Sequence, residues 1–253
     1  MPEPIALSVI IPAYNESARI GQSLEQVYSY LRQQSIPSEV IVVDDGSTDD
    51  TAKVVKGHII HQPGAPVRII LLSNPSNMGK GYSIKTGVLH AGGSIVAFTD
   101  ADLSAPITEL DKLLEPIRQG THDIVIGSRA INRSLIGRRQ SPWREYAGRM
   151  FNLLIRVILG LKFKDTQCGF KAYRRDLIVP IFKKQQIQGF SFDVEILYLA
   201  LRQGLRVQEV AVIWNHVEGS RVHMIKDSLR MFGGLLKIRW YEWIGKYAGL
   251  QCG

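Results

Sequence analysis

The stretch "VRIILLSNPSNMGKGYSIKTGVLHAGGSIVAFTDAD", residues 67–102, contains one strand–helix–strand unit. Residues 67–73 and 94–100 are short apolar runs of strand length, and residues 81–91 between them are predicted to form a helix. A strand followed by a helix and a second strand is the building unit of a parallel sheet. This stretch therefore predicts an α/β fold.

The same unit repeats on both sides of this stretch. Further strands are predicted at residues 5–13, 39–45 and 122–128, and further helices at 17–33, 49–59 and 106–119. Four strand–helix repeats and a fifth strand predict a mostly parallel sheet with helices on both faces.

The regular alternation stops after Arg129. The segments that follow are predicted as a basic loop at 130–143, a helix at 143–160, an extended segment at 165–176 that leads into another helix, a helix at 192–204 and a strand at 206–214. The tail at 221–250 is amphipathic, and we expect Gly233 and Gly234 to bend or split it.

Charged residues collect at the predicted strand ends. Asp44, Asp45, Asp100, Asp102 and Arg129 lie at or just past the carboxyl ends of strands. In parallel sheets this is the edge where ligands bind, so we expect these five residues to converge there.

Asp100 and Asp102 would repel each other unless a cation lies beside them. Their hard oxygen ligands favour Mg²⁺ or Mn²⁺, and Mg²⁺ typically takes one or two carboxylates while substrate phosphates fill other positions. Taken alone, the D-x-D pattern also fits a turn or a helix cap, because Ser104 and Pro106 suit the start of a helix.

The composition indicates one large domain in a reducing compartment. The 253 residues are 45% hydrophobic, enough for one sizeable core. Cys168 and Cys252 have neither disulfide nor zinc-ligand spacing. Residues 1–16 do not resemble a signal peptide, and no apolar run reaches the roughly 18 residues needed to span a bilayer. We therefore expect a cytoplasmic protein that does not cross a membrane.

The net charge of +8 is unevenly placed. Residues 1–128 carry 9 Lys or Arg against 14 Asp or Glu, whereas residues 129–175 carry 12 against 2. A strongly basic segment indicates an anionic partner, such as substrate phosphate, anionic lipid or nucleic acid. A basic nucleic-acid-binding module is therefore the alternative from outside the enzymes, and the lack of any nucleic-acid-binding motif argues against it.

Several sequence blocks together resemble the family-2 glycosyltransferases, which are nucleotide-sugar-dependent enzymes of the Rossmann-like GT-A fold. The blocks follow the family's order and cover most of the chain: "VIIPAYNE" (9–16), "VVDDGSTDDT" (42–51), "NMGKGYSIKTG" (77–87), "TDADLSAP" (99–106), "VIGSR" (125–129), "DTQCGFKAYRRD" (165–176), "GFSFDVEILYLA" (189–200) and "HVEGSRV" (216–222). The resemblance is strongest to the branch that transfers sugars to dolichyl or polyprenyl phosphates.

The resemblance implies residues for the sugar donor. By similarity, Asp100 and Asp102 hold the divalent metal, Asp102 being the firmer ligand and Asp100 being shared with the ribose. The other residues that this similarity assigns to the nucleotide sugar are Pro12, Ala13, Tyr14, Glu16, Asp44, Asp45, Asn77, Gly79, Lys80 and Ala101.

The resemblance also implies residues for the acceptor. A lipid phosphate is already anionic near neutral pH, so its attack needs positioning and charge screening more than a general base. Arg129 is the first candidate for binding the acceptor phosphate, with Arg144 and Lys171 as further candidates. Asp193 is the base that a hydroxyl acceptor would need, and Asp102, Arg129 and Asp193 are the expected catalytic residues.

We expect a metal-dependent, inverting transferase that moves glucose from UDP-glucose to a polyprenyl or dolichyl phosphate. Ser104 favours glucose, because mannosyl-transferring relatives tend to carry Gln there. GDP-mannose as donor, or a soluble or polysaccharide hydroxyl acceptor, remain alternatives.

The expected organisation is a GT-A domain at residues 1–215 and an amphipathic helical tail at 216–253. Residues 1–128 form the donor half of the domain and residues 129–215 the acceptor half. The basic segment and the tail, which is rich in Trp and Tyr, would hold the protein peripherally on the inner face of a membrane. The apolar side of the tail would equally suit packing on the catalytic domain or on a second subunit of a homo-oligomer.

Overall fold

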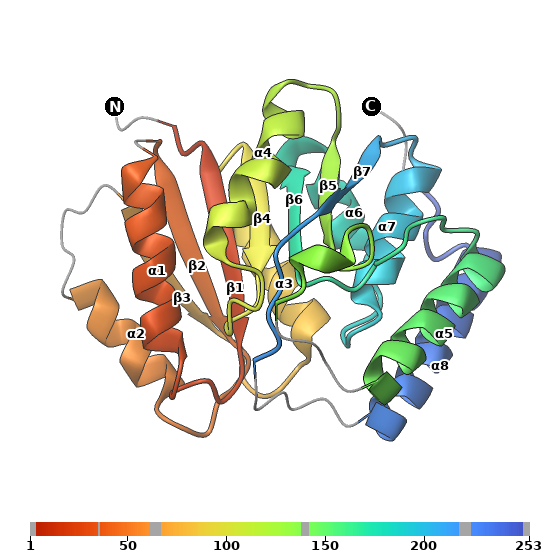
Figure 1. Cartoon of the computed structure of the whole chain (residues 1–253), viewed down its shortest axis with the longest axis horizontal. Helices are drawn as coiled ribbons and strands as arrows, with labels where there is room; N and C mark the ends of the chain where they lie inside the picture. The colour runs from red at the N-terminus through yellow and green to blue at the C-terminus, as the bar shows by residue number, and fades with distance from the viewer. Residues whose placement is uncertain (1–3, 35, 61–66, 138–141, 218–223, 250–253) are drawn as a thin grey trace.

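A computed structural model describes residues 4–34, 36–60, 67–137, 142–217 and 224–249. In this part of the chain seven strands form one sheet in the order β3-β2-β1-β4-β6-β5-β7 (Figure 1). The strands are β1 (Leu7–Ala13), β2 (Ser38–Asp44), β3 (Val67–Ser73), β4 (Ile95–Thr99), β5 (Ile124–Ser128), β6 (Phe170–Arg174) and β7 (Val207–Ala211). All neighbouring pairs are parallel except those of β6, which runs antiparallel between β4 and β5.

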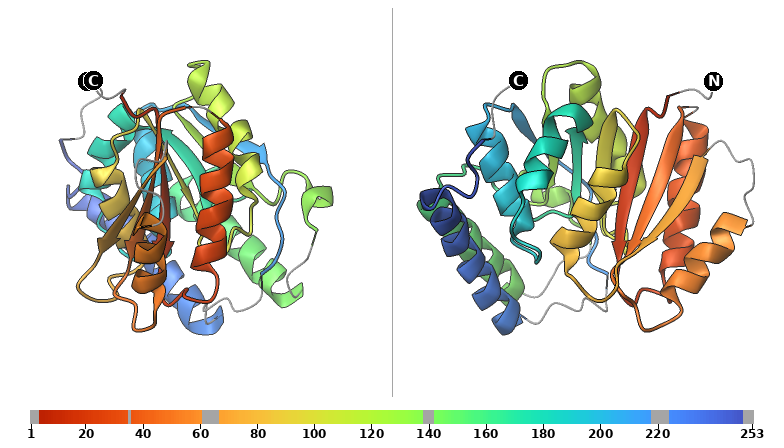
Figure 2. Two further views of the ribbon diagram at one scale, coloured as in Figure 1. Left: turned by 90° about the vertical axis from the view of Figure 1, so that its left-hand side faces the viewer. Right: turned by 180° about the vertical axis from the view of Figure 1, so that it is seen from behind.

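Helices cover both faces of the sheet (Figure 2). They are α1 (Ile20–Gln33), α2 (Thr51–Ile60), α3 (Lys80–His90), α4 (Leu110–Arg118), α5 (Pro142–Leu159), α6 (Arg175–Lys184), α7 (Phe192–Arg202) and α8 (Met224–Trp243), with short 3-10 turns at Ile107–Glu109 and Arg133–Leu135. The mostly parallel α/β sheet predicted from the sequence is confirmed.

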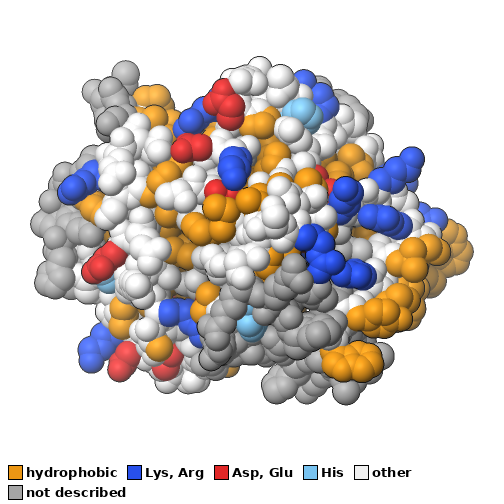
Figure 3. All heavy atoms as spheres, in the orientation of Figure 1, with side chains coloured by type: hydrophobic (Ala, Val, Ile, Leu, Met, Phe, Trp, Pro, Cys, Tyr) orange, Lys and Arg blue, Asp and Glu red, His pale blue; other side chains and the backbone are white. Residues whose placement is uncertain are grey.

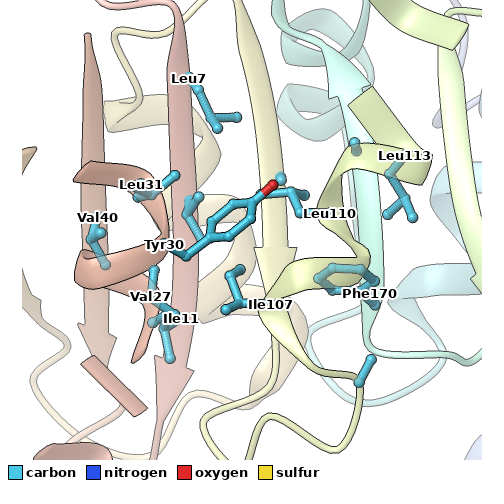
Figure 4. Close-up of a cluster of buried hydrophobic side chains, with 14 of the residues drawn as sticks. Leu7, Ile11, Val27, Tyr30, Leu31, Val40, Ile107, Leu110, Leu113 and Phe170 are labelled. Atoms are coloured by element: carbon cyan, nitrogen blue, oxygen red, sulfur yellow. The ribbon is translucent and has the colours of Figure 1, made fainter. Parts of the chain in front are cut away.

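The sheet separates two hydrophobic clusters, because successive side chains of a strand point to opposite faces. Val9 and Ile11 of β1 pack with α1 and α4, whereas Ile10 between them packs with α3 and α7. Figure 4 shows part of the first cluster, with Tyr30 of α1 lying between Leu31 and Leu110. Strands buried on both faces explain why the β1, β2 and β4 segments read as continuous apolar runs.

The expectation that Gly233 and Gly234 break the C-terminal helix is wrong. α8 runs without interruption from Met224 to Trp243. A Cβ on Gly234 would lie 2.5 Å from the Ser191 Oγ, so this glycine allows α8 to approach the start of α7 closely. Close packing outweighs the low helix propensity of glycine here.

α8 lies beside α5 at one end of the molecule (Figures 1 and 2). Leu235 and Ile238 of α8 are fully buried and belong to the same cluster as Phe192 of α7 and Ile155 of α5. Among the described residues, no helix is long and apolar enough to cross a membrane.

Candidate active site

The carboxyl ends of β1 and β4 lie side by side at the point where the strand order reverses. From β1 the chain proceeds outward through β2 and β3, and it then returns to place β4 on the other side of β1. Ligands bind at such switch points in parallel sheets. A cavity of about 1130 Å³ opens there and extends to α5 and α8.

At the donor end of the cavity, Asp45 fixes the loop that leads into α3. Its Oδ1 accepts hydrogen bonds from the Asn74 Nδ2 (2.7 Å) and the Met78 amide (3.0 Å), and its Oδ2 accepts one from the Gly79 amide (2.8 Å). Gly79 has a φ of 102°, and a Cβ there would lie 2.7 Å from the Gln188 carbonyl oxygen. Only glycine suits this position without strain.

Most of the residues assigned to the donor by similarity do line this cavity: Pro12, Ala13, Tyr14, Glu16, Asp45, Asn77, Gly79, Lys80, Asp100 and Ala101. Asp44 does not, because its carboxylate is turned into the 44–47 loop, where Oδ1 accepts from the Ser47 amide at 3.1 Å.

Asp100 and Asp102 both line the cavity just past β4. The Asp100 Oδ1 lies 2.5 Å from the Lys80 Nζ, and the Asp102 Oδ1 accepts a hydrogen bond from the Ser104 amide at 2.9 Å. Burial lowers the pKa of Lys80, but the charges of Asp100, Asp193 and Asp102 outweigh burial and raise the pKa above its ordinary value. Leu103, with a φ of 46°, belongs to the tight turn that follows the two aspartates, and its amide donates to the Asp100 carbonyl oxygen at 3.1 Å.

This pair of aspartates fits a Mg²⁺ or Mn²⁺ ion that is shared with a substrate. Among the described residues there is no group of three or more His, Cys, Asp or Glu side chains placed to hold a metal. Two carboxylates are nevertheless the number that such ions take when phosphate oxygens complete their coordination.

Arg129 lies at the end of β5 and is held from two sides. Its Nε and Nη2 bind the two carboxylate oxygens of Asp165 at 2.6 and 2.8 Å, and the guanidinium lies 5.5 Å from the ring centre of Trp214. Burial raises the pKa of Asp165, but the charge and hydrogen bonds of Arg129 outweigh burial and hold the pKa below its usual range. Arg129 lines the cavity as a rigidly oriented cation.

The structure does not bring Lys171 and Asp193 into the cavity. The Lys171 side chain is fully buried, and its Nζ lies 2.8 Å from the Asp193 Oδ1. Burial raises the pKa of Asp193, and the charges of Lys171 and Lys80 offset this only in part. In this structure Lys171 is therefore not placed to meet an acceptor phosphate, nor Asp193 to act as a base, because both side chains are buried in the core and neither lines the cavity. The side chain of Arg144 lies outside the described residues.

Several cavity residues were missed by the sequence analysis. Trp214 and His216 stack with ring centres 6.0 Å apart, and the 186–191 loop lines the cavity beside Gly79. His216 and residues 189–191 stand in family-like blocks, which was a signal, whereas Trp214 and residues 186–188 carry no charge or motif that points to a ligand. Gly148 and Phe151 of α5 and Lys237 of α8 also line the cavity.

Comparison with known proteins agrees with this geometry. Residues 8–182 match the family described as Glycosyl transferase family 2. The dolichyl-phosphate beta-glucosyltransferase of Saccharomyces cerevisiae is 36% identical over 263 residues, covering 97% of this chain and 77% of the relative. The human enzyme of the same name is 34% identical, covering 92% of this chain and 74% of the relative.

Among solved structures, glucosyl-3-phosphoglycerate synthase from Mycobacterium tuberculosis in complex with UDP has a TM-score of 0.66 and 24% identity, covering 92% of this chain and 80% of its own. A structure of that enzyme with Mn²⁺, UDP-glucose and glycerol 3-phosphate has a TM-score of 0.65 and 22% identity, with 93% and 79% covered. These likenesses concern the GT-A fold.

The chain belongs to glycosyl transferase family 2. It is a nucleotide-sugar-dependent glycosyltransferase.

Proposed function

We propose that this enzyme transfers glucose from UDP-glucose to a polyprenyl phosphate of the dolichyl class, with a divalent metal and inversion at the anomeric carbon. The names of its relatives support the sugar and the acceptor. One structural observation carries the proposal: the carboxylates that line the cavity are confined to the donor half. Among the described residues, the lining carboxylates are Glu16, Asp45, Asp100 and Asp102, and none comes from residues 129–137, 142–217 or 224–241.

The donor half suits a nucleoside diphosphate. Asp100 and Asp102 would hold Mg²⁺ or Mn²⁺, and the metal would supply charge stabilisation to the leaving diphosphate. Lys80, 2.5 Å from the Asp100 Oδ1, adds a further cation on the same side of the cavity. Pro12 and Tyr14, at the end of β1, line the same end of the cavity and would enclose the base and ribose.

The acceptor half suits a phosphate rather than a hydroxyl group. A sugar hydroxyl needs a base to remove its proton, whereas a phosphate oxygen is already anionic. Asp193 does not line the cavity and has Lys171 as its partner, while Arg129 and Lys237 offer positive charge. Arg129 would orient the phosphate through its guanidinium, because Asp165 and Trp214 fix the plane of that group.

The two helices that line the far end of the cavity, α5 and α8, also carry a surface that suits a bilayer. The apolar face consists of the exposed side chains Trp143, Tyr146, Met150, Leu153 and Val157 of α5 and Phe232, Leu236, Trp240 and Trp243 of α8. Figure 3 shows hydrophobic side chains at this end of the molecule with Lys and Arg beside them. Exposed Arg149, Arg156 and Arg239 belong to the same two helices. Aromatic rings and cations around an apolar face are typical of proteins that lie peripherally on a membrane.

Transfer assays would test this function. Purified enzyme with UDP-[¹⁴C]glucose and Mn²⁺ or Mg²⁺ is expected to label dolichyl phosphate in detergent, with GDP-mannose as the control donor. Labelling that is confined to water-soluble hydroxyl acceptors would contradict the lipid acceptor, and mannose transfer in place of glucose would contradict the donor.

A further inference from the structure

The 165–169 segment contacts both functional ends of the cavity. Asp165 binds the Arg129 guanidinium through both carboxylate oxygens. Four residues later, Gly169 lies against Asp100, the proposed metal ligand: a Cβ on Gly169 would lie 2.0 Å from the Asp100 Oδ2. A displacement of this segment would therefore move the acceptor-side arginine and the donor-side aspartate together.

One end of the segment is fixed by Glu209 of β7. The Glu209 carboxylate accepts hydrogen bonds from the amides of Lys164 and Asp165 at 2.9 and 2.7 Å. The Gln167 amide in turn donates to the Asp165 Oδ1 at 3.2 Å. These hydrogen bonds fix the Asp165 end of the segment. The Gly169 end must be fixed by a different contact.

Lys171 is that second anchor. Its Nζ donates to the Cys168 carbonyl oxygen at 2.5 Å, although Lys171 is fully buried. In the sheet, Lys171 of β6 lies opposite Phe98 of β4 and Ile126 of β5. Asp100 and Arg129 directly follow the ends of these two strands. The ammonium group also lies 5.2 Å from the centre of the Phe98 ring.

A buried ammonium needs a counter-charge, because its desolvation is costly. Asp193, at the start of α7, supplies it at 2.8 Å and is itself buried. If the position served only to fill the core, a pair of apolar side chains would suit it as well or better. A lysine is required here only if the hydrogen bond donated by its ammonium group is needed. The acceptor of that bond is the Cys168 carbonyl oxygen.

We propose that Lys171 and Asp193 are positioning residues, which hold the 165–169 segment so that Asp100 and Arg129 keep their places in the cavity. This inference rests on the proposed function for the roles of those two side chains. Lys171 and Asp193 would thus affect the reaction through the positions of Asp100 and Arg129, without touching a substrate.

Two double variants would test the inference, because both remove the two charges and they differ in one hydrogen bond. Lys171→Met/Asp193→Leu fills the space with apolar groups, whereas Lys171→Gln/Asp193→Asn keeps a neutral donor for the Cys168 carbonyl. We expect the Met/Leu variant to bind Mn²⁺ about tenfold more weakly than wild type in the presence of UDP, because loss of a group that supports a metal ligand typically weakens metal binding by about that factor. The Gln/Asn variant should bind Mn²⁺ more tightly than the Met/Leu variant, and the KM for acceptor should follow the same order.

Asp123→Asn is the matched control. Asp123 is a buried carboxylate at the opposite end of the sheet, where it binds the Arg206 guanidinium at 2.8 and 3.0 Å. Its loss is expected to lower the thermal stability without changing Mn²⁺ affinity. If the Met/Leu variant does not fold, Asp193→Asn alone serves, and we expect weaker Mn²⁺ binding there too.

Wild-type Mn²⁺ affinity in the Met/Leu variant, or equal losses in both double variants, would overturn the inference. These results are separate from the proposed function. An enzyme that binds Mn²⁺ and UDP but glucosylates no polyprenyl phosphate would contradict the function, while the comparison of Mn²⁺ affinities would still decide the role of Lys171.

Discussion

Asp100 and Asp102 differ in how the protein holds them. The Asp100 Oδ1 lies 2.5 Å from the Lys80 Nζ, and Gly169 packs against the Asp100 carboxylate. Asp102 instead accepts a hydrogen bond from the Ser104 amide. A neutral amide side chain in place of Asp102 would still accept that hydrogen bond through its Oδ1. The turn can therefore be kept while the charge is removed, which makes Asp102 the cleaner of the two to test.

For Asp102→Asn we expect Mn²⁺ affinity in the presence of UDP to fall at least about tenfold, because one of two carboxylate ligands is lost. Calorimetric titration with Mn²⁺ would measure it, with Asp50→Asn as a control, since Asp50 is exposed and lies 4.0 Å from Lys53. Unchanged affinity in Asp102→Asn would contradict a metal site at this pair.

The ion pair of Asp165 with Arg129 should make the free energy of unfolding depend on pH. Its folded pKa is depressed below the ordinary 3.8, because Arg129 outweighs the effect of burial. The stabilisation is therefore fully present above about pH 4 and is lost as the pH falls through the folded pKa.

The Asp165→Asn variant is expected to be less stable than wild type at pH 7 by up to about 3 kcal/mol, since a buried pair is broken while Arg129 stays partly exposed. The difference should shrink as the pH drops below about 4. Urea unfolding at a series of pH values would measure it. A stability difference that grows toward low pH would contradict a lowered pKa of Asp165 in the folded protein.

At the residue scale, the sequence indicates which side chains are charged but not how each charge is satisfied. Asp45 and Lys80 are in the cavity, as the motif implied. Lys171 stands in an equally good motif, yet it points into the core toward Asp193. The strand register that turns Lys171 inward depends on β6 pairing with β4 and β5, and no local pattern contains that pairing.

At the scale of elements, the first half of the chain was predictable because each strand and helix there has its own apolar period. The antiparallel β6 was not, because a five-residue segment carries no signal for its direction or its place between β4 and β5. The continuity of α8 was missed since the packing of Gly234 on Ser191 is a tertiary contact.

The apolar face of α5 and α8 gives a prediction at this scale. Leu153→Glu/Leu236→Glu places two charges on half-exposed positions of that face. Binding to vesicles of neutral and anionic phospholipid is expected to weaken at least about tenfold, since full burial of each leucine would be worth roughly 1.5–3 kcal/mol. Co-sedimentation would measure it.

Leu89→Glu is the control for this experiment, because Leu89 of α3 has comparable exposure away from that face. Equal vesicle binding by all three proteins would rule out the face as a membrane contact. A shift from dimer to monomer in the double variant, without a change in vesicle binding, would assign the face to a second copy of the chain.

For the whole molecule, the cavity joins elements that are distant in the sequence. β1 and β4 supply the donor end, β5 and the 165–169 segment supply the middle, and α5 and α8 close the far end. The proposed transfer of a sugar from a water-soluble nucleotide donor to a lipid phosphate, with release of the nucleoside diphosphate, needs such a passage between two environments. α8, which follows residue 215, forms part of the cavity wall.

Two neighbouring leucines test whether α8 folds with the rest of the domain. Leu235 is fully buried against α7, whereas Leu236 is half exposed. If α8 is part of the core, Leu235→Ala should lower the free energy of unfolding by about 2–5 kcal/mol, and Leu236→Ala should change it by less than about 0.5 kcal/mol. With Trp143, Trp240 and Trp243 replaced by Phe so that Trp214 is the remaining tryptophan, urea unfolding followed by circular dichroism and by tryptophan fluorescence would show one shared transition in each protein. An independent tail predicts the opposite: the main transition would stay in place in Leu235→Ala, and α8 would unfold separately at lower urea.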